Sequence, residues 1–262
     1  QQVFAGLGYK VFDNFSIGAN LSYLYGDITY SAHTEFNNTN AFSSVRTQQI
    51  SISSYKLDLG AQYTHKFGPK HVINLGATYS HGHELNGEGY YYTETYDSDA
   101  ILQTQTGDTI SNAFSIPHTF GVGMTYVYNN SLTIGMDYTL QKWAKCKYFN
   151  KDGQYSDRTK ISFGAEYMRN NQGRSFWDFV RYRAGFHYAE PYAKVNGKEG
   201  AREYGVSLGF GLPIFRSKSI LNISGQYLKI SPKVKGMLEE NYLKLNIGLT
   251  FNEGWFMKYK VE

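Results

Sequence analysis

The chain has 262 residues, of which 41% are hydrophobic, and its 26 basic and 22 acidic residues give a net charge of +4. Charges of the two signs are interspersed, which excludes the concentrated basic surface of a nucleic-acid-binding protein. No segment approaches the roughly 20 consecutive apolar residues that a transmembrane helix needs. The single cysteine, Cys146, excludes an intramolecular disulfide, and we expect an incidental thiol that is exposed or faces a lumen.

Taken in chain order, segments of about ten residues alternate an apolar or aromatic residue with Gly, Ser, Thr, Asn or a charged residue. In the last segment Leu243, Leu245, Ile247, Leu249 and Phe251 fall on one face of an extended strand. Repeated along a chain, this period of two is typical of an antiparallel transmembrane β-barrel, with lipid outside and a polar lumen inside. We count about eleven such strands, at residues 3–12, 15–25, 55–63, 73–79, 120–128, 132–140, 161–167, 180–188, 204–214, 221–227 and 241–251.

The connections between these predicted strands alternate between short and long, as in barrels with short periplasmic turns and longer outer loops. Short turns are expected at Asp13-Asn14, Gly68-Pro69, Asn129-Asn130, Asn170-Asn171 and Arg216-Ser217. Long connections are expected near Asn38, Glu88, Asp152, Gly197 and Lys235. Aromatic residues near the strand ends predict an interfacial girdle: Tyr23, Tyr63, Tyr126, Tyr167, Tyr188, Tyr227, Trp255 and Phe256.

The odd number of predicted strands indicates that part of the barrel precedes this chain. Single-chain bacterial barrels have an even number of strands and both ends in the periplasm. We therefore interpret residues 1–262 as a single outer-membrane barrel domain whose first strands are missing. The alternative is a further strand within Tyr90 to Tyr96, which would make the number even.

The inward face of almost every predicted strand carries glycine, either because the lumen leaves room for a ligand or plug, or because the sheet must bend to close. Charged residues share this face and are expected to form a structural network or to bind the polar head of an amphipathic ligand: Asp58, Asp137, Glu166, Arg181, Arg183, His187 and Lys244. Glu166 is in phase with Arg181 and Arg183 on the neighbouring strand. We expect an ion pair there within about 4 Å, with Asp137 near enough to join it.

The sequence contains no nucleophile elbow, phosphate loop or paired-carboxylate motif, so we predict no enzymatic activity and no cofactor. A barrel enzyme such as a lipase or protease is the alternative, but no motif favours it. His81-Gly82-His83-Glu84 places two histidines two residues apart without a further ligand set. We interpret it as the polar start of a loop and predict no metal site.

Four blocks of the sequence, residues 161–168, 181–188, 200–213 and 242–262, resemble the FadL/TodX family, and they look most like its Bacteroidota members. The resemblance implies a barrel of roughly fourteen strands, plugged by an N-terminal hatch and located in the bacterial outer membrane. This chain lacks the hatch, the Asn-Pro-Ala motif of the hatch, and the strand whose kink makes the lateral exit.

The resemblance implies passive uptake of hydrophobic small molecules such as long-chain fatty acids. The expected surroundings are outer-membrane lipid or lipopolysaccharide, and no nucleic acid is expected as a partner. The alternative is a non-transport barrel subunit of a Bacteroidota outer-membrane assembly or secretion complex, whose loops and turns would dock other envelope subunits. In either case we expect the last strand to reach the periplasmic interface near Phe251 to Phe256.

Overall fold

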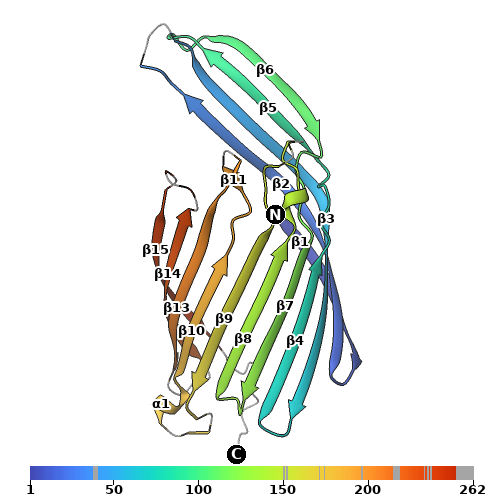
Figure 1. Ribbon diagram of the computed structural model, residues 1–262, viewed down its shortest axis with the longest axis vertical. Coiled ribbons are helices and arrows are strands. Elements are labelled where there is room, and N and C mark those ends of the chain that lie inside the picture. The colour runs from blue at the N-terminus through green and yellow to red at the C-terminus, as the bar shows by residue number, and fades with distance from the viewer. Residues whose placement is uncertain are drawn as a thin grey trace, which may run out of the picture.

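The computed structural model describes residues 1–37, 41–149, 151, 153–170, 172–173, 175–195, 197–214, 219–232, 234, 236 and 238–251. Within them, one antiparallel sheet has an eleven-strand path, called the wall below, that follows the chain from β1 to β15 (Figure 1). Every predicted strand is therefore confirmed. The path consists of β1 (Gln2–Phe12), β2 (Phe15–Thr34), β3 (Ser43–Phe67), β4 (His71–Ser80), β7 (Thr119–Tyr128), β8 (Leu132–Gln141), β9 (Arg158–Met168), β10 (Arg181–Ala189), β13 (Ala201–Pro213), β14 (Ile220–Pro232) and β15 (Glu240–Thr250).

The wall has one apolar face and one polar face, as the alternation predicts. Side chains in the apolar phase are exposed, for example Leu245 at 71% and Ile247 at 68%. One row of residues that lie opposite one another across the sheet is apolar or aromatic on every wall strand from β3 to β15: Tyr63, Leu75, Met124, Met136, Phe163, Phe186, Val206, Tyr227 and Leu243. This row starts near the end of β3 that leads into a short turn and finishes near the end of β15 that leads out of a long loop. The strands are therefore tilted and staggered as in the wall of a β-barrel.

Helical structure is confined to short segments among the described residues, namely η1 (Trp143–Lys145) and α1 (Phe176–Phe179). A two-stranded hairpin, β11 (Lys194–Val195) and β12 (Lys198–Glu199), lies in the connection between β10 and β13. In the part of the chain that the structure describes, no helix is long and apolar enough to span a membrane. The fold is all-β.

Short turns close one end of the wall at Asp13-Asn14, Gly68-Pro69 and Asn129-Asn130, as predicted. The short turn expected at Asn170-Asn171 is wrong, because β9 and β10 are joined by a longer connection, and Arg216-Ser217 lies outside the described residues. Asn129 and Asn130 both have positive φ, 51° and 52°, which is the backbone of a two-residue type I′ hairpin turn. Gly68 has φ of 69° in the turn between β3 and β4, a conformation that glycine adopts without steric cost. The connection from β9 to β10 carries α1, which Figure 1 shows at the same end of the molecule.

Four strands continue beyond the wall as a second region, called the arm below (Figure 1). The arm consists of residues 26–52, from the outer parts of β2 and β3, and residues 87–111, which hold β5 (Gly87–Tyr96) and β6 (Leu102–Ser111). β2 pairs with β3 out to Thr34 and Ser44. On its other edge β3 leaves β4 and pairs with β5, and β5 pairs in turn with β6.

The arm corrects the expectation that the connections near Asn38 and Glu88 are loops. Both connections contain regular strands, and the alternative strand at Tyr90 to Tyr96 exists as β5. It pairs with the outer half of β3 and lies off the wall, so the number of wall strands is unchanged. These strands were not predicted because both of their faces are rich in Ser, Thr, Gln and Tyr. Alternation of apolar and polar residues identifies a strand only when one face is apolar.

The buried hydrophobic cluster of the described residues lies at the base of the arm and not inside the wall. Ile50, Ala113 and Phe149 are each at most 5% exposed, and Ile52, Ile110, Phe114 and Tyr148 pack against them. Phe149 comes from the connection between β8 and β9, so this contact joins that connection to the arm. A wall one strand thick has no second layer to pack against, which places the cluster where a loop covers the sheet.

Candidate functional site

The polar face of the wall carries an ion-paired cluster on β9 and β10. Glu166 lies opposite Arg183 in the register, and its two carboxylate oxygens accept hydrogen bonds from Arg181 Nη1 at 3.0 Å and from Arg183 Nε at 2.6 Å. The predicted pair between Glu166 and an arginine is confirmed, with both arginines taking part. The three side chains are 29–37% exposed, so their charges are shielded from one another by water only in part.

This cluster extends across β13 to the last two strands. Arg183 Nη1 donates to Asn222 Oδ1 at 2.6 Å, and Asn222 Nδ2 donates to Thr250 Oγ1 at 3.1 Å. The guanidinium passes over Gly211, where an added Cβ would lie 3.2 Å from Arg181 Cβ and 3.4 Å from Arg183 Nη2. A larger residue at Gly211 would crowd both arginines, so glycine here makes room for a hydrogen-bond chain from β9 to β15.

A second polar group lies nearer the other end of the same strands. His187 Nε2 is 2.8 Å from Glu203 Oε1, and Arg158 Nη2 is 4.0 Å from Glu203 Oε2. The His187 ring lies over Gly205, where an added Cβ would overlap the ring atoms. His187 therefore belongs to an ionic group whose partners, Glu203 and Arg158, were not among the predicted residues.

The remaining predicted charges take different positions. On β3, both carboxylate oxygens of Asp58 accept a hydrogen bond from Lys56 Nζ at 2.7 Å. Asp58 Oδ1 also accepts a short hydrogen bond from Ser80 Oγ. Lys244 on β15 lies opposite Gln226, with its Nζ 5.9 Å from the ring centre of Tyr242.

Asp137 does not join the arginine cluster, which corrects the expectation. It lies opposite Gly123 and Ser162, whereas Glu166 lies opposite Thr133. Four residues along a strand correspond to about 13 Å. Asp137 and Glu166 share a face, but the register separates them along the wall, and phase alone could not reveal that separation.

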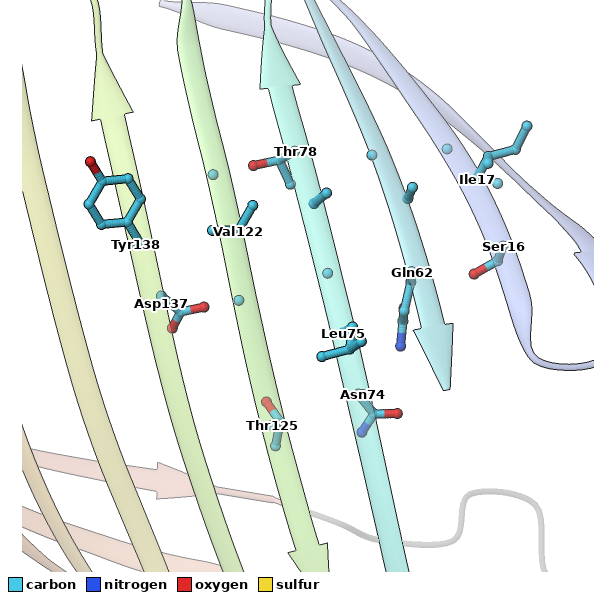
Figure 2. A pocket seen from close by; sticks show the side chains of 18 of the residues that line it. Ser16, Ile17, Gln62, Asn74, Leu75, Thr78, Val122, Thr125, Asp137 and Tyr138 are labelled. Carbon is cyan, nitrogen blue, oxygen red and sulfur yellow. The ribbon is translucent and has the colours of Figure 1, made fainter. Parts of the chain in front are cut away.

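Asp137 instead lines a cavity along the wall strands β1 to β8, with a volume of about 690 Å³. Figure 2 shows Ser16, Gln62, Asn74, Thr78 and Asp137 around it. Glycine supplies much of the remaining lining: Gly8, Gly18, Gly60, Gly76, Gly121 and Gly123. The lining therefore combines hydroxyl, amide and backbone groups with apolar side chains such as Ile17, Leu75 and Val122 (Figure 2). The use of this cavity, and of the seven predicted inward charges as a binding lumen, stays a prediction.

Among the predicted girdle tyrosines, Tyr23, Tyr63, Tyr167 and Tyr227 have exposed rings, Tyr126 and Tyr188 are half-buried, and all except Tyr167 have a polar contact for the hydroxyl. The Tyr126 hydroxyl forms a hydrogen bond of 2.7 Å with His71 Nδ1, and the Tyr227 hydroxyl donates one of 2.7 Å to Asn241 Oδ1. The Tyr23 hydroxyl forms a hydrogen bond of 2.7 Å with Ser53 Oγ. Tyr63 and Tyr188 make longer contacts of 3.4 Å, to His65 and Glu190, and Tyr167 is 48% exposed. Trp255 and Phe256 lie outside the described residues.

At the other end of the wall, aromatic residues from separate connections form one cluster. The Trp143 ring lies 4.9 Å from that of Tyr192 and 5.4 Å from that of Tyr155, and Phe114 approaches it at 6.4 Å. Burial raises the pKa of Tyr155 to about 12. The cluster fastens the β8–β9 and β10–β13 connections to the base of the arm. It was not predicted, because its members are far apart in sequence and in no repeating pattern.

Cys146 belongs to the β8–β9 connection and is 4% exposed, which corrects the expectation of an exposed or lumenal thiol. Its Sγ contacts the Lys142 carbonyl oxygen at 3.8 Å. Burial raises the pKa of the thiol to about 11, and the nearby Asp157 carboxylate acts in the same direction. A thiol held in its neutral form is a poor nucleophile.

Three histidines lie close together where the wall joins the arm. The His81 ring lies 5.6 Å from that of His83 and 5.2 Å from that of His118. Burial, with the neighbouring His81 and His118, lowers the pKa of His83 below its ordinary value. Among the described residues, no group of three His, Cys, Asp or Glu side chains has the geometry to hold a metal ion.

The arm is strongly acidic, whereas the rest of the chain is basic. It holds seven of the 22 acidic residues and one of the 26 basic residues, giving the arm a formal charge of −6 and the remainder +10. Large side chains are exposed on it, including Ile28 at 58%, Tyr30 at 62% and Tyr91 at 40%. The arm is thus a charged and aromatic region that continues β2 and β3 beyond the wall (Figure 1).

Comparisons with known proteins give a family and a fold. A family model described as BamG matches residues 1–262, and no curated protein matches the chain. The chain is similar to the structure of a Pseudomonas aeruginosa FadL homologue, with 17% identity and a TM-score of 0.59 over 88% of this chain and 59% of that one. The Ralstonia pickettii toluene transporter TbuX gives 14% identity and a TM-score of 0.55 over 87% and 63%.

The CymD monoaromatic hydrocarbon channel gives 14% identity and a TM-score of 0.55 over 86% of this chain and 67% of that one. The chain therefore spans 59–67% of the length of these three structures. At such identities the likeness concerns the fold alone, and at that level the expected resemblance to FadL-like proteins is confirmed.

Proposed function

This chain belongs to the BamG family, and we propose that it is an outer-membrane β-barrel that serves as a non-transport subunit of a bacterial envelope assembly complex. The observation that carries the proposal is the arm, a four-stranded acidic region that extends beyond the wall. A passage for small molecules does not require such a region, whereas an exposed, charged extension of this kind is suited to docking another protein.

Location in the bacterial outer membrane is part of this proposal. The wall exposes an apolar row on nine neighbouring strands, and exposed apolar surface of that extent needs lipid or a protein partner. The girdle tyrosines, with hydroxyls bonded to polar groups, are suited to the membrane–water interface. Two of the three similar solved structures are a hydrocarbon channel and a toluene transporter, so no enzymatic role is proposed.

The polar face argues for a structural wall more than for a hydrophobic passage. Glu166, Arg181, Arg183, Asn222 and Thr250 form one chain of contacts from β9 to β15. An apolar ligand moving along this face would displace water from paired charges without replacing their hydrogen bonds, which is costly. Such a network instead holds neighbouring strands in register.

The test is gentle-detergent purification of the full-length protein from its own outer membrane, with a variant that shortens the arm. Residues 90–109 would be replaced by Asn-Gly, because Gly89 and Ile110 lie opposite each other and a two-residue turn can join them. We expect other envelope subunits to co-purify stoichiometrically with the native chain and to be lost from the shortened one. Migration of the native chain as a lone monomer under all conditions would contradict the proposal.

A second candidate function is passive passage of hydrophobic molecules such as long-chain fatty acids. The glycine-lined cavity of about 690 Å³ favours it, because that volume suits a small ligand, and each buried methylene of a ligand contributes about 0.8 kcal/mol. Liposomes containing the full-length protein would then show saturable uptake of a fatty acid or an aromatic hydrocarbon. The same liposomes with Gly76→Leu, which fills the cavity, would show reduced uptake, whereas a subunit without transport function gives none in either case.

A further inference from the structure

The outer edge of β6 is a strand with one partner. In the part of the chain that the structure describes, β6 pairs with β5 alone, and Figure 1 shows it along one edge of the arm. We infer that this edge accepts an added strand, namely an extended basic segment of a partner protein. The inference rests on the proposed function and specifies how the arm would bind another subunit.

The hydrogen-bond pattern identifies the backbone groups at the free edge. Asn112 N donates to Gly87 O at 2.7 Å, so these two residues form a hydrogen-bonded pair of the β5–β6 ladder. In an antiparallel ladder such pairs alternate with pairs that do not exchange bonds. The alternation directs the N–H and C=O groups of Gln105, Gly107 and Thr109 away from β5. The Thr109 N–H agrees with this, since it donates to the Asp108 side chain at 2.8 Å.

Apart from one irregularity at Gln103, where the register with β5 shifts by one residue, the edge lacks the features that usually prevent strand addition. Residues 102–111 contain no proline, lysine or arginine, and Asp108 is the single charged residue. Every residue of β6 except Ile110 is exposed. Natural edge strands are protected by lysine, proline, bulges or a short length, whereas Thr104 to Ser111 pair with β5 without a break in register and give about 26 Å of regular edge. Such an edge is suited to β-strand addition by a peptide segment.

Charge selects the kind of segment. The arm carries seven acidic residues and one basic residue, and Glu88, Glu94 and Asp108 lie on β5 and β6 themselves. A lysine- or arginine-rich strand would be attracted to this surface, and complementary charge favours both encounter and correct pairing. A second copy of the arm would bring a charge of −6 against −6, and anionic lipopolysaccharide would be repelled for the same reason. The occupant is therefore a basic segment of a different protein.

The direct test uses the full-length protein in nanodiscs and two ten-residue peptides in which Val and Thr alternate with Lys, or with Glu in the matched peptide. The Gln105→Pro/Thr109→Pro variant removes two edge N–H donors while leaving the β5–β6 bonds. The Gln105→Ala/Thr109→Ala variant is the control, because it changes the same side chains and keeps the donors. Fluorescence anisotropy at low salt measures binding.

We expect the Lys peptide to bind about tenfold more tightly than the Glu peptide, with that binding lost in the proline variant and kept in the alanine variant. Equal binding of the two peptides, no binding of the Lys peptide, or binding unchanged by proline would overturn the inference. All variants should retain heat-modifiable migration, which reports a folded wall.

The same variants separate this inference from the proposed function. If the proline variant purifies with all the subunits that accompany the native chain, the β6 edge is not the docking site although the complex exists. If the native chain has no partners, the proposed function itself fails. A photo-cross-linker at Gln103 should capture a Lys- or Arg-rich segment, and capture of a second copy of this chain would contradict the assignment.

Discussion

Glycine on the polar face of the wall makes room for side chains of neighbouring strands. A Cβ at Gly205 would overlap His187, and one at Gly123 would overlap Asp137. The sequence left two explanations open, space for a ligand and curvature of the sheet. The structure adds a third, because these glycines lie beneath charged groups, while Gly76 and Gly248 have nothing within 4 Å of an added Cβ.

Substitution of Gly205 by Ala should therefore destabilise the wall. The added methyl group displaces the His187 ring from Glu203, and overpacking of this kind costs about 1–3 kcal/mol. The midpoint of heat-induced unfolding in detergent should fall. Gly248→Ala is the matched control, since the methyl group there enters open space, and an equal fall in both variants would show that crowding at His187 is not the cause.

The thiol of Cys146 should be unreactive in the folded protein. Its pKa of about 11 exceeds that of a free cysteine, so the thiolate fraction at neutral pH is small. Labelling by a maleimide at pH 7.5 should require prior heating. Between pH 8 and pH 11 the rate in the folded protein should keep rising, whereas an unburied thiol would level off near its ordinary pKa of about 8.5. Rapid labelling at pH 7.5 would contradict the burial.

At the scale of elements, Phe149 packs the β8–β9 connection against the base of the arm. Phe149 is 5% exposed and packs on Ile50 and Ala113. Gly89 lies under it, where an added Cβ would be 2.9 Å from Phe149 Cε1. Tyr148 adds a hydrogen bond of 3.2 Å to Gln48. The β8–β9 connection thus holds the arm to the wall.

Replacement of Phe149 by Ala should loosen the arm without unfolding the wall. Loss of a buried phenylalanine side chain costs about 3–5 kcal/mol, here confined to the base of the arm. Limited proteolysis should cleave residues 26–52 or 87–111 faster, while heat-modifiable migration is kept. Phe36→Ala, at a side chain that is 61% exposed, should leave the cleavage rate unchanged, and equal protection in both variants would place the anchor elsewhere.

The sequence predicted the strands that have one apolar face. It did not predict the strands of the arm, which have no apolar face. Leu75 and Met124 alternate with small polar residues, and their strands were correct. Residues 102–111 read Leu-Gln-Thr-Gln-Thr-Gly-Asp-Thr-Ile-Ser, which has no apolar period, yet they form β6 by pairing with β5. That strand is stabilised by its ladder and by the cluster at Phe149, and both are long-range.

For the whole molecule, the apolar face is the surface that must meet lipid. Leu245, Ile247 and Leu249 share that phase on β15, whereas Asn246 lies on the opposite face, opposite Ser224. A lysine introduced on the apolar face of β15 should therefore prevent insertion into the membrane, whereas a lysine introduced on its polar face should not.

Changing Leu245, Ile247 and Leu249 together to Lys should abolish membrane insertion. Each lysine on the lipid face costs about 2–4 kcal/mol near the midplane. Asn246→Lys places the same charge on the polar face, beside the native Lys244, and should insert normally. Heat-modifiable migration and fractionation of outer membranes measure both. A normally inserted triple variant would show that the phase or the membrane location is wrong.

The sequence by itself determined the wall: its strands, their phase, the Asn129-Asn130 turn and the pairing of Glu166 with arginine. These follow from local rules, because period-two alternation and turn chemistry act within a few residues, and neighbouring strands connected by short turns bring in-phase side chains together. Only the tertiary structure decided the arm, the loop cluster around Trp143, the burial of Cys146 and the separation of Asp137 from Glu166. Those features depend on register and on packing between residues far apart in the chain, and no local pattern records either one.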